Sequence, residues 1–397
     1  MAASALKFER VTSVGVGIGL LSFALPFLTL KPNRLVQGTS FYVWNVLLPH
    51  EITLLFVPWC LLILILLRYS KHPSIPLIAG ATGNLAIIVL FLLVGQAAGR
   101  LMQFQEPFAR VSIGFGCWGL VAGSYVLIIN GFQKGAEYGI LRYIAAFWGL
   151  LGLVVLLSTG YLNELSVLKE YAARKGRFLQ EFGRHVRLSG IAVLLAVAIG
   201  TPLGVWSFRK KLLEKPIFFL INGIQTIPSL ALFGLLIAPL SLLSFRFPFL
   251  REMGVKGIGT APALIALTLY ALLPITRNTF TSLSVIDPSI LEAARGMGMN
   301  RMQLLLDIQL PLSLPIILSG IRVSMVQAIG NTTVAALIGA GGFGVFVFQG
   351  LGQAAFDLIL LGTIPVILLA IFTDRLMQLL VVALTPLGLR SATESVR

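Results

Sequence analysis

Charged side chains are scarce in this sequence. Asp, Glu, Lys and Arg together make up 11% of the 397 residues, whereas 57% of the residues are apolar. A water-soluble chain of this composition would lack the polar side chains needed to cover its surface. Apolar runs of about 20 residues recur along the chain, which is the length that a helix needs to cross a hydrocarbon core of roughly 30 Å. The sequence therefore predicts an all-α, polytopic membrane protein with about ten spanning helices.

Cysteine and histidine are also rare. Cys60 and Cys117 each lie inside an apolar run with no CxxC motif and no histidine nearby, so neither a disulfide nor a metal site has support. His50, His72 and His185 fall in predicted loops, and no serine, histidine and acid are placed so as to favour a nucleophilic site. We therefore expect no catalytic, cofactor-binding or metal-binding residue in this chain.

A phosphate-binding loop is absent as well. No glycine is followed by lysine, so the chain has no GxxxxGK[ST] segment, and any ATPase, with its ATP and Mg²⁺, must be another polypeptide. Gly339, Gly341 and Gly344 form a GxGxxG string, but a run of membrane length precedes it and no acid lies about 20 residues further on. A glycine-rich break or close packing between membrane helices explains the string better than dinucleotide binding.

The formal net charge of +15 does not indicate nucleic acid, because the basic residues are scattered between apolar runs. We expect membrane lipid around the chain and interpret the basic residues as topology signals in a multi-pass protein of the cell (inner, cytoplasmic) membrane. The amino terminus resembles a signal sequence but lacks a small-x-small cleavage site, which favours a retained first span.

The apolar runs fall into two blocks. We predict an N-terminal block over 1–162, an amphipathic linker over 163–187, a second block over 188–387 and a tail over 388–397. The predicted spans lie near 11–30, 52–67, 76–98, 111–131, 143–162, 188–207, 216–243, 258–275, 312–337 and 356–379. In the linker, Phe178, Phe182 and Val186 are spaced four apart, which suits a helix along the membrane surface or a solvated linker helix.

The linker conflicts with the positive-inside tendency. An amino terminus inside the cell places several basic residues in the cytoplasm, as that tendency requires: Lys7, Arg10, Arg68, Lys71, Lys134, Arg142 and Arg209 to Lys211. The same orientation places the six basic residues of the linker outside. Either a further re-entrant segment exists, or the second block sets its own orientation.

Polar side chains within apolar runs concentrate in the second block. Such groups are costly in lipid unless they face other helices or water, so we predict a transport pathway there. The candidate pathway residues are Gln225, Thr226, Ser229, Asn331, Thr332 and Thr333. Interhelical hydrogen bonding is the alternative for any one of them.

A polar insert at 286–311 separates the eighth and ninth predicted spans. Asp287 can cap a helix that has Pro288 at its first position, and Gly296 or Gly298 can end that helix. A second cap at Asn300, with Gln303 three residues on, predicts another helix that runs to Pro311. The predicted insert is therefore a short helix, a glycine break and a second helix.

A short helix held across the membrane face can dock in a groove of a soluble partner and transmit the partner's movement. Ala293 and Ala294 would allow close approach, and Glu292 could pair with Arg295 or Arg301 to fix the loop. An ordinary capped loop is the alternative.

The spacing of Glu292, Ala293, Ala294, Gly298, Ile308, Leu310 and Pro311 resembles the EAA loop of binding-protein-dependent ABC importers. Three further segments, 224–236, 270–280 and 329–344, resemble the glycine betaine, choline and related osmoprotectant permeases of that superfamily. Together these similarities cover about half of the chain, over 188–387. The N-terminal block resembles the extra helices of long-form osmoprotectant permeases.

This resemblance implies a coupling role for Asp287, Glu292, Ala293, Ala294, Gly298, Ile308 and Pro311. It also implies a cytoplasmic ABC ATPase, an extracytoplasmic substrate-binding protein and a second permease, identical or related, as partners. A permease for amino acids or another small solute is the alternative within this class.

A proton-coupled secondary transporter is the alternative from another class. Such proteins need ionisable groups at membrane depth. Here only Asp357 and Asp374 enter the last predicted span, and we expect Asp374 to form a local ion pair with Arg375 or to anchor at the interface.

Overall fold

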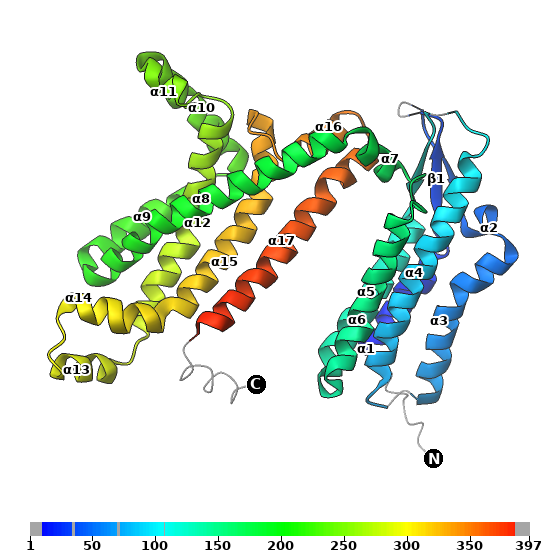
Figure 1. The fold of residues 1–397 in the computed structure, drawn as a ribbon, viewed down its shortest axis with the longest axis horizontal. Helices are drawn as coiled ribbons and strands as arrows, with labels where there is room; N and C mark the ends of the chain where they lie inside the picture. Colours follow the sequence, from blue (N-terminus) through cyan, green and yellow to red (C-terminus); the bar gives the residue numbers. More distant parts are fainter. Residues whose placement is uncertain (1–9, 34–35, 70–71, 107, 386–397) are drawn as a thin grey trace. The chain divides into compact units, whose positions relative to one another are not determined.

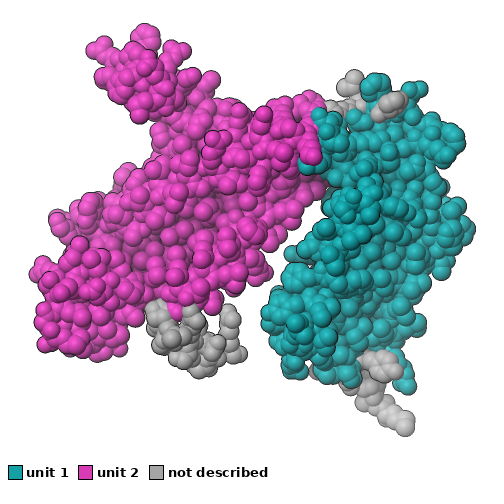
Figure 2. All heavy atoms as spheres, in the orientation of Figure 1, with its two compact units in different colours: residues 1–173 teal, residues 174–397 magenta. Residues whose placement is uncertain are grey.

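The computed structural model describes residues 10–33, 36–69, 72–106 and 108–385, so the predicted tail over 388–397 lies outside the described residues. The chain divides into two compact units, Met1–Ala173 (unit 1) and Arg174–Arg397 (unit 2), which Figure 2 colours separately. Among the described residues, nine helices are long and apolar enough to cross a membrane. The fold is a helical membrane fold, as the sequence predicts.

Unit 1 is a helical bundle with a small sheet at one end (Figure 1). Its core includes the fully buried Trp59, whose ring lies where a side chain at Gly19 would be. Glycine thus allows close packing between membrane helices. The helices are α1 (Arg10–Ser22), α2 (Val43–Val46), α3 (Pro49–Tyr69), α4 (Ile75–Met102), α5 (Phe115–Lys134), η1 (Gly135–Tyr138), α6 (Ile140–Ser158) and α7 (Ser166–Ala173).

The three-stranded antiparallel sheet, in the order β2-β1-β3, was not predicted. Strand β1 (Leu28–Lys31) pairs with β2 (Thr39–Phe41) and β3 (Arg110–Ile113). The predicted span over 11–30 is therefore wrong in its second half, because α1 ends at Ser22. Pro26 disfavours a continued helix, since its ring would clash with the carbonyl four residues earlier, and the strand pairing of Leu28–Lys31 fixes the extended backbone that follows. The 13 residues of α1 extend only about 20 Å, which is short for a membrane span.

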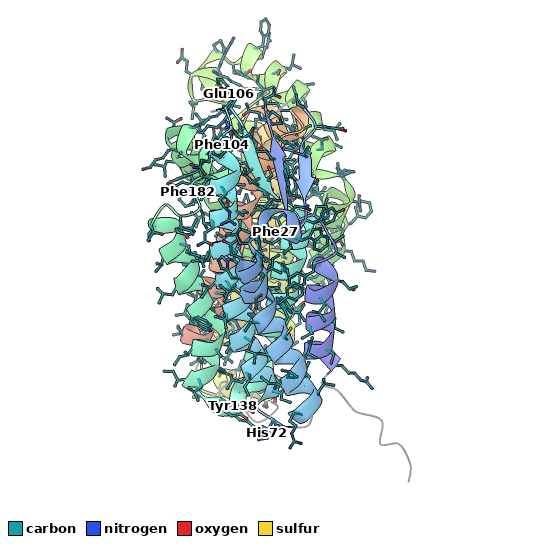
Figure 3. All side chains as sticks on the ribbon, turned by 90° about the vertical axis from the view of Figure 1, so that its right-hand side faces the viewer. Phe27, His72, Phe104, Glu106, Tyr138 and Phe182 are labelled. Atoms are coloured by element: carbon teal, nitrogen blue, oxygen red, sulfur yellow. The ribbon has the colours of Figure 1, made fainter. Side chains whose placement is uncertain are left out.

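The end of unit 1 that lies opposite the strands carries basic residues. Figure 3 shows Phe104 and Glu106 at the end that holds the strands, and His72 and Tyr138 at the opposite end. The basic residues of the described helix ends on the His72 side are Arg10, Arg68, Lys134 and Arg142. The loops predicted to be cytoplasmic thus gather at one end of unit 1.

Unit 2 is built around α12, which packs against α8 and α15 (Figure 1). Small buried residues on α12, including Ala263, Ala266 and Ala271, allow this close packing. The helices are α8 (Lys175–Arg209), α9 (Lys211–Thr226), α10 (Ser229–Arg246), α11 (Pro248–Glu252), α12 (Thr260–Ser284), α13 (Pro288–Gly296), α14 (Arg301–Gln303), the π-helical η2 (Leu304–Gln309), α15 (Leu310–Ala335), η3 (Ala336–Ile338), α16 (Gly344–Gly352) and α17 (Phe356–Leu384).

Two predicted elements of this region are corrected by the structure. The linker over 163–187 is not a separate element, because its first part forms α7 and its second part begins the 35-residue α8. Phe178 and Phe182 of that segment pack on Phe343, so this face contacts protein. The predicted span over 216–243 is two helices, α9 and α10, since Ile227 and Pro228 adopt extended backbone between them.

Candidate functional site

The insert between α12 and α15 begins with a capped helix. Asp287 Oδ1 accepts a hydrogen bond of 2.9 Å from the Ser289 N–H, and Pro288 occupies the first position of α13. Backbone and side-chain hydrogen bonds from Ser289 hold the pKa of Asp287 below its usual value. The cap is therefore a carboxylate at neutral pH, and its negative charge interacts favourably with the positive end of the helix dipole.

A glycine break follows α13. The Gly298 N–H donates to the Arg295 carbonyl at 2.9 Å, and Gly298 has a φ of +81°, in the left-handed region that favours glycine. Asn300 then starts the next helix through a reciprocal capping box. Its Oδ1 accepts from the Gln303 N–H, and Gln303 Oε1 accepts from the Asn300 N–H, each at 2.9 Å. Both predicted caps and the predicted break have the expected geometry.

The second helix of the insert does not end at Pro311. The helical run continues from Arg301 to Ile338, and Pro311 lies exposed inside it. In η2 the Leu310 N–H donates to the Leu305 carbonyl, five residues earlier. This π-helical turn shifts the hydrogen-bond ladder just before Pro311, which has no N–H to donate, so the helix accommodates the proline. Residues 301–311 therefore form the base of a spanning helix and not a loop.

The insert presents an exposed surface of mixed character. Glu292, Ala293 and Gly298 are exposed, Ile308 is half-buried, and Ala294 is buried where α13 packs against η2. Met297 is 71% exposed. In the described part of the chain Glu292 forms no ion pair, so the predicted pairing with Arg295 or Arg301 is wrong. Water competes for these exposed charges, and such pairs contribute little.

The end of α8 contacts the base of the long helix at this site. Arg209 Nη2 donates to the Arg301 carbonyl at 3.2 Å. The insert is therefore attached to α8 as well as to the run from Arg301 to Ile338.

Three candidate pathway residues lie together at the break between α9 and α10. Gln225 Nε2 donates to the Tyr270 carbonyl, and the Tyr270 hydroxyl donates to the Ile227 carbonyl. Thr226 is exposed and Ser229, the first residue of α10, is half-buried. The break thus leaves polar groups beside α12.

The other candidates lie near the end of α15. Thr332 is fully buried, and its hydroxyl donates to the Ala328 carbonyl of the same helix at 2.7 Å. Asn331 and Thr333 are half-buried. The Thr332 hydroxyl thus has its hydrogen-bond partner within its own helix, which gives no support to a pathway role.

Two polar clusters of unit 2 were missed by sequence reasoning. Arg322 of α15 donates from Nε and Nη2 to the two carboxylate oxygens of Asp374 on α17, at 2.5 and 2.7 Å. The predicted pairing of Asp374 with its neighbour Arg375 is therefore wrong. A lone arginine in the middle of an apolar run was the signal available, because such a charge requires a partner.

The second missed cluster joins α8 to the segment between α15 and α16. Glu181 Oε2 accepts from the Gly342 N–H at 2.7 Å, and His185 Nδ1 accepts from the Phe343 N–H at 3.2 Å. The positive φ angles of Gly339, Gly341 and Gly342 confirm that this glycine string is a helix break.

Known proteins match both parts of the chain. Residues 192–385 match the family described as "Binding-protein-dependent transport system inner membrane component", and residues 9–168 match "ABC transporter permease YehY, N-terminal domain". The osmoprotectant import permease protein OsmW of Salmonella typhimurium is 42% identical over 52% of this chain and 91% of its own length. The carnitine transport permease protein OpuCB of Listeria monocytogenes is 40% identical over 53% of this chain and 89% of its own length.

A third relative matches in the same way. The glycine betaine/carnitine/choline transport system permease protein OpuCB of Bacillus subtilis is 36% identical over 55% of this chain and 94% of its own length. These relatives thus match little more than half of the present chain along nearly their whole length. The chain belongs to the family of binding-protein-dependent transport system inner membrane components.

Proposed function

We propose that this chain is the permease subunit of an ATP-driven importer for a small osmoprotectant, such as glycine betaine, choline or a related quaternary amine. The observation that carries the proposal is the capped α13 with its glycine break, placed at the base of one continuous helix of unit 2. The names of the relatives supply the substrate class.

The proposed assembly contains two permeases, two cytoplasmic ABC ATPases that bind ATP and Mg²⁺, and an extracytoplasmic binding protein. The exposed face of α13, with Glu292 and Ala293, docks in a cleft of the ATPase together with Met297, which follows the helix. Because the helix from Arg301 to Ile338 begins next to α13, movement of α13 tilts or shifts that helix. The free energy comes from the different affinity of ATP for the two arrangements.

The break at Ile227 and Pro228 supports a pathway beside α12. Non-helical backbone at membrane depth is tolerated where it is buried in protein or lines a water-filled cavity. In the proposed importer Gln225, Thr226 and Ser229 line that route, and Asn331 and Thr333 contribute further polar groups near its end.

A proton-coupled transporter is the second candidate, because the Arg322–Asp374 pair lies within two candidate spans. Both oxygens of Asp374 accept from Arg322, so proton uptake by this carboxylate would have to break two charge-assisted hydrogen bonds. A reconstituted complex tests this directly. Uptake that requires ATP and persists without a proton gradient supports the importer, and the reverse dependence supports the second candidate.

Gly298→Asp tests the coupling role. A carboxylate at the break introduces charge into the surface that the ATPase would grip, while aspartate tolerates the left-handed backbone better than most residues. We expect normal membrane insertion and a fall of about tenfold or more in substrate taken up per ATP hydrolysed. The measurement is uptake and phosphate release in proteoliposomes that hold the complete importer.

Gly254→Asp is the matched control. Gly254 has a similar φ of +86°, and a side chain at either glycine would meet no atom within 4 Å. We expect this variant to keep the parental ratio of uptake to hydrolysis. A parental ratio in Gly298→Asp as well would show that the insert does not couple.

The substrate class is tested on the binding-protein partner, with glycine betaine, choline and a neutral amino acid as ligands. Preferential binding of the quaternary amines supports the proposal. Binding of the amino acid alone would favour an amino-acid permease.

A further inference from the structure

The segment between α15 and α16, residues 339–344, is called the glycine loop here. Gly339, Gly341 and Gly342 have φ angles of +79°, +84° and +84°. A side chain at Gly341 would lie 2.9 Å from Glu181 Oε2, and one at Gly342 would lie 3.0 Å from His185 Nδ1. The loop therefore passes directly against the side chains of α8, and only glycine permits this approach.

Glu181 and His185 hold two successive amides of the glycine loop. Glu181 binds the Gly342 N–H and His185 binds the Phe343 N–H. Because His185 Nδ1 accepts, Nε2 carries the ring proton and donates to the Ile329 carbonyl of α15, 3.0 Å away. The two side chains are 4% and 0% exposed.

A buried carboxylate at this position is costly unless it is hydrogen-bonded. Glu181 Oε1 accepts from Arg184 Nη1 at 3.2 Å, while the Arg184 side chain is 53% exposed. The second oxygen of Glu181, Oε2, thus accepts from the loop backbone. An aliphatic side chain could fill the same volume without that cost, but it could not define where the loop amides lie.

The glycine loop and the insert lie at opposite ends of one helix. The run from Arg301 to Ile338 has 38 residues and extends roughly 55 Å, with α13 beside its start and the glycine loop after its end (Figure 1). At the far end the Gly259 N–H also donates to the Ile338 carbonyl, at 2.7 Å. One helix thus joins the insert to the loop whose amides Glu181 and His185 bind.

We propose that Glu181 and His185 form a latch that positions the glycine loop and makes substrate uptake depend on movement of the helix from Arg301 to Ile338. This inference rests on the proposed function, in which α13 lies in the cytoplasm and the glycine loop lies on the side where the binding protein delivers substrate. Glu181 and His185 are positioning residues in this scheme, because they act through the loop.

The first experiment measures the latch in the purified full chain, without any partner. Glu181→Ala removes the acceptor of the Gly342 N–H, so hydrogen exchange of the amides at Gly342 and Phe343 should rise about tenfold or more. Glu181→Gln keeps an amide oxygen that can accept the same N–H and should stay within about threefold of the parent. Arg187→Ala, which removes an exposed arginine from the same helix, should not change the exchange.

The second experiment uses the complete importer in proteoliposomes. Glu181→Ala should lower uptake per ATP hydrolysed by about tenfold. Glu181→Gln should keep most of the parental uptake, and Arg187→Ala should match the parent. If Glu181→Ala does not fold, His185→Ala replaces it with the same expectations.

Unchanged exchange in Glu181→Ala would overturn the latch, and so would parental coupling in a variant whose loop exchanges faster. An equal defect in Glu181→Gln would also overturn it, since the acceptor oxygen is retained there. Failure of the parental importer to take up substrate with ATP would instead sink the proposed function, which the exchange experiment does not need.

Discussion

At the residue scale, the insert depends on hydrogen bonds between groups that are two or three residues apart in the sequence. Asp287 binds the Ser289 N–H, and Asn300 and Gln303 bind each other's backbone N–H groups. Such caps arise from the sequence itself, because the acceptor and the free amides lie in the same turn. This locality explains why Asp287, Asn300 and Gln303 could be assigned before the structure was known.

The Asp287 cap predicts a dependence on pH. Its pKa in the folded protein is lowered by Ser289, so its contribution to α13 is full above the ordinary aspartate value of about 4 and is lost as the pH falls through the lowered pKa. We expect α13 amides to be protected from hydrogen exchange at neutral pH and to lose protection on acidification, with rates corrected for pH.

Asp287→Asn is the comparison for that experiment. Asparagine caps a helix about as well as aspartate but does not titrate, so this variant should keep its protection at acidic pH. Asp287→Ala should lose protection at every pH. An identical acid response in Asp287→Asn would show that another group titrates.

At the element scale, α15 and α17 are joined by the Arg322–Asp374 pair. Removal of one partner leaves a charge inside a membrane span, so Asp374→Asn should lower stability by roughly 2 kcal/mol. The double variant with Arg322→Gln should lose less than the sum of the two single variants. Thermal midpoints in detergent provide the measurement.

Arg375→Gln is the matched control for the ion pair. Arg375 follows Asp374 directly, is exposed and donates to Gln378, so its removal should change stability by less than about 0.5 kcal/mol. Strict additivity in the Arg322 and Asp374 cycle would show that the pair does not stabilise the contact between the two helices.

Apolar periodicity predicted most of the spanning helices but not their interruptions. Pro26 and Pro228 were visible in the sequence, yet proline lies inside α3, α8, α12 and α17 without ending them. Whether a proline breaks a helix therefore depends on tertiary contacts, such as the sheet after α1 or the Tyr270 hydroxyl at Ile227. Contacts between distant residues, such as Glu181 with Gly342, leave no pattern in a single sequence.

At the scale of the whole molecule, the two units have separate cores and separate relatives. The buried residues of unit 1 form a continuous cluster from Val16 to Leu165, and the clusters of unit 2 begin at Leu188. The curated relatives match about half of this chain along nearly their full length. Unit 2 therefore corresponds to nearly the whole length of these relatives.

This division predicts that unit 2 inserts without unit 1. We predict that the second block sets its own orientation despite the basic residues at the start of α8, so a truncated chain that begins at Arg174 should adopt the orientation of the full chain. Met297→Cys reports the orientation, since the Met297 side chain is exposed and this residue caps α13 through its backbone N–H alone, which cysteine retains. The truncated chain has no other thiol, because Cys60 and Cys117 both lie in unit 1.

A membrane-impermeant thiol reagent then separates the possibilities. We expect Met297→Cys to react only after the membrane is permeabilised, in the truncated chain and in a full chain that carries Cys60→Ser. Reaction in sealed cells by the truncated chain alone would mean that unit 1 orients unit 2. Reaction in sealed cells by the full chain would place α13 outside, where an ATPase in the cytoplasm could not reach it.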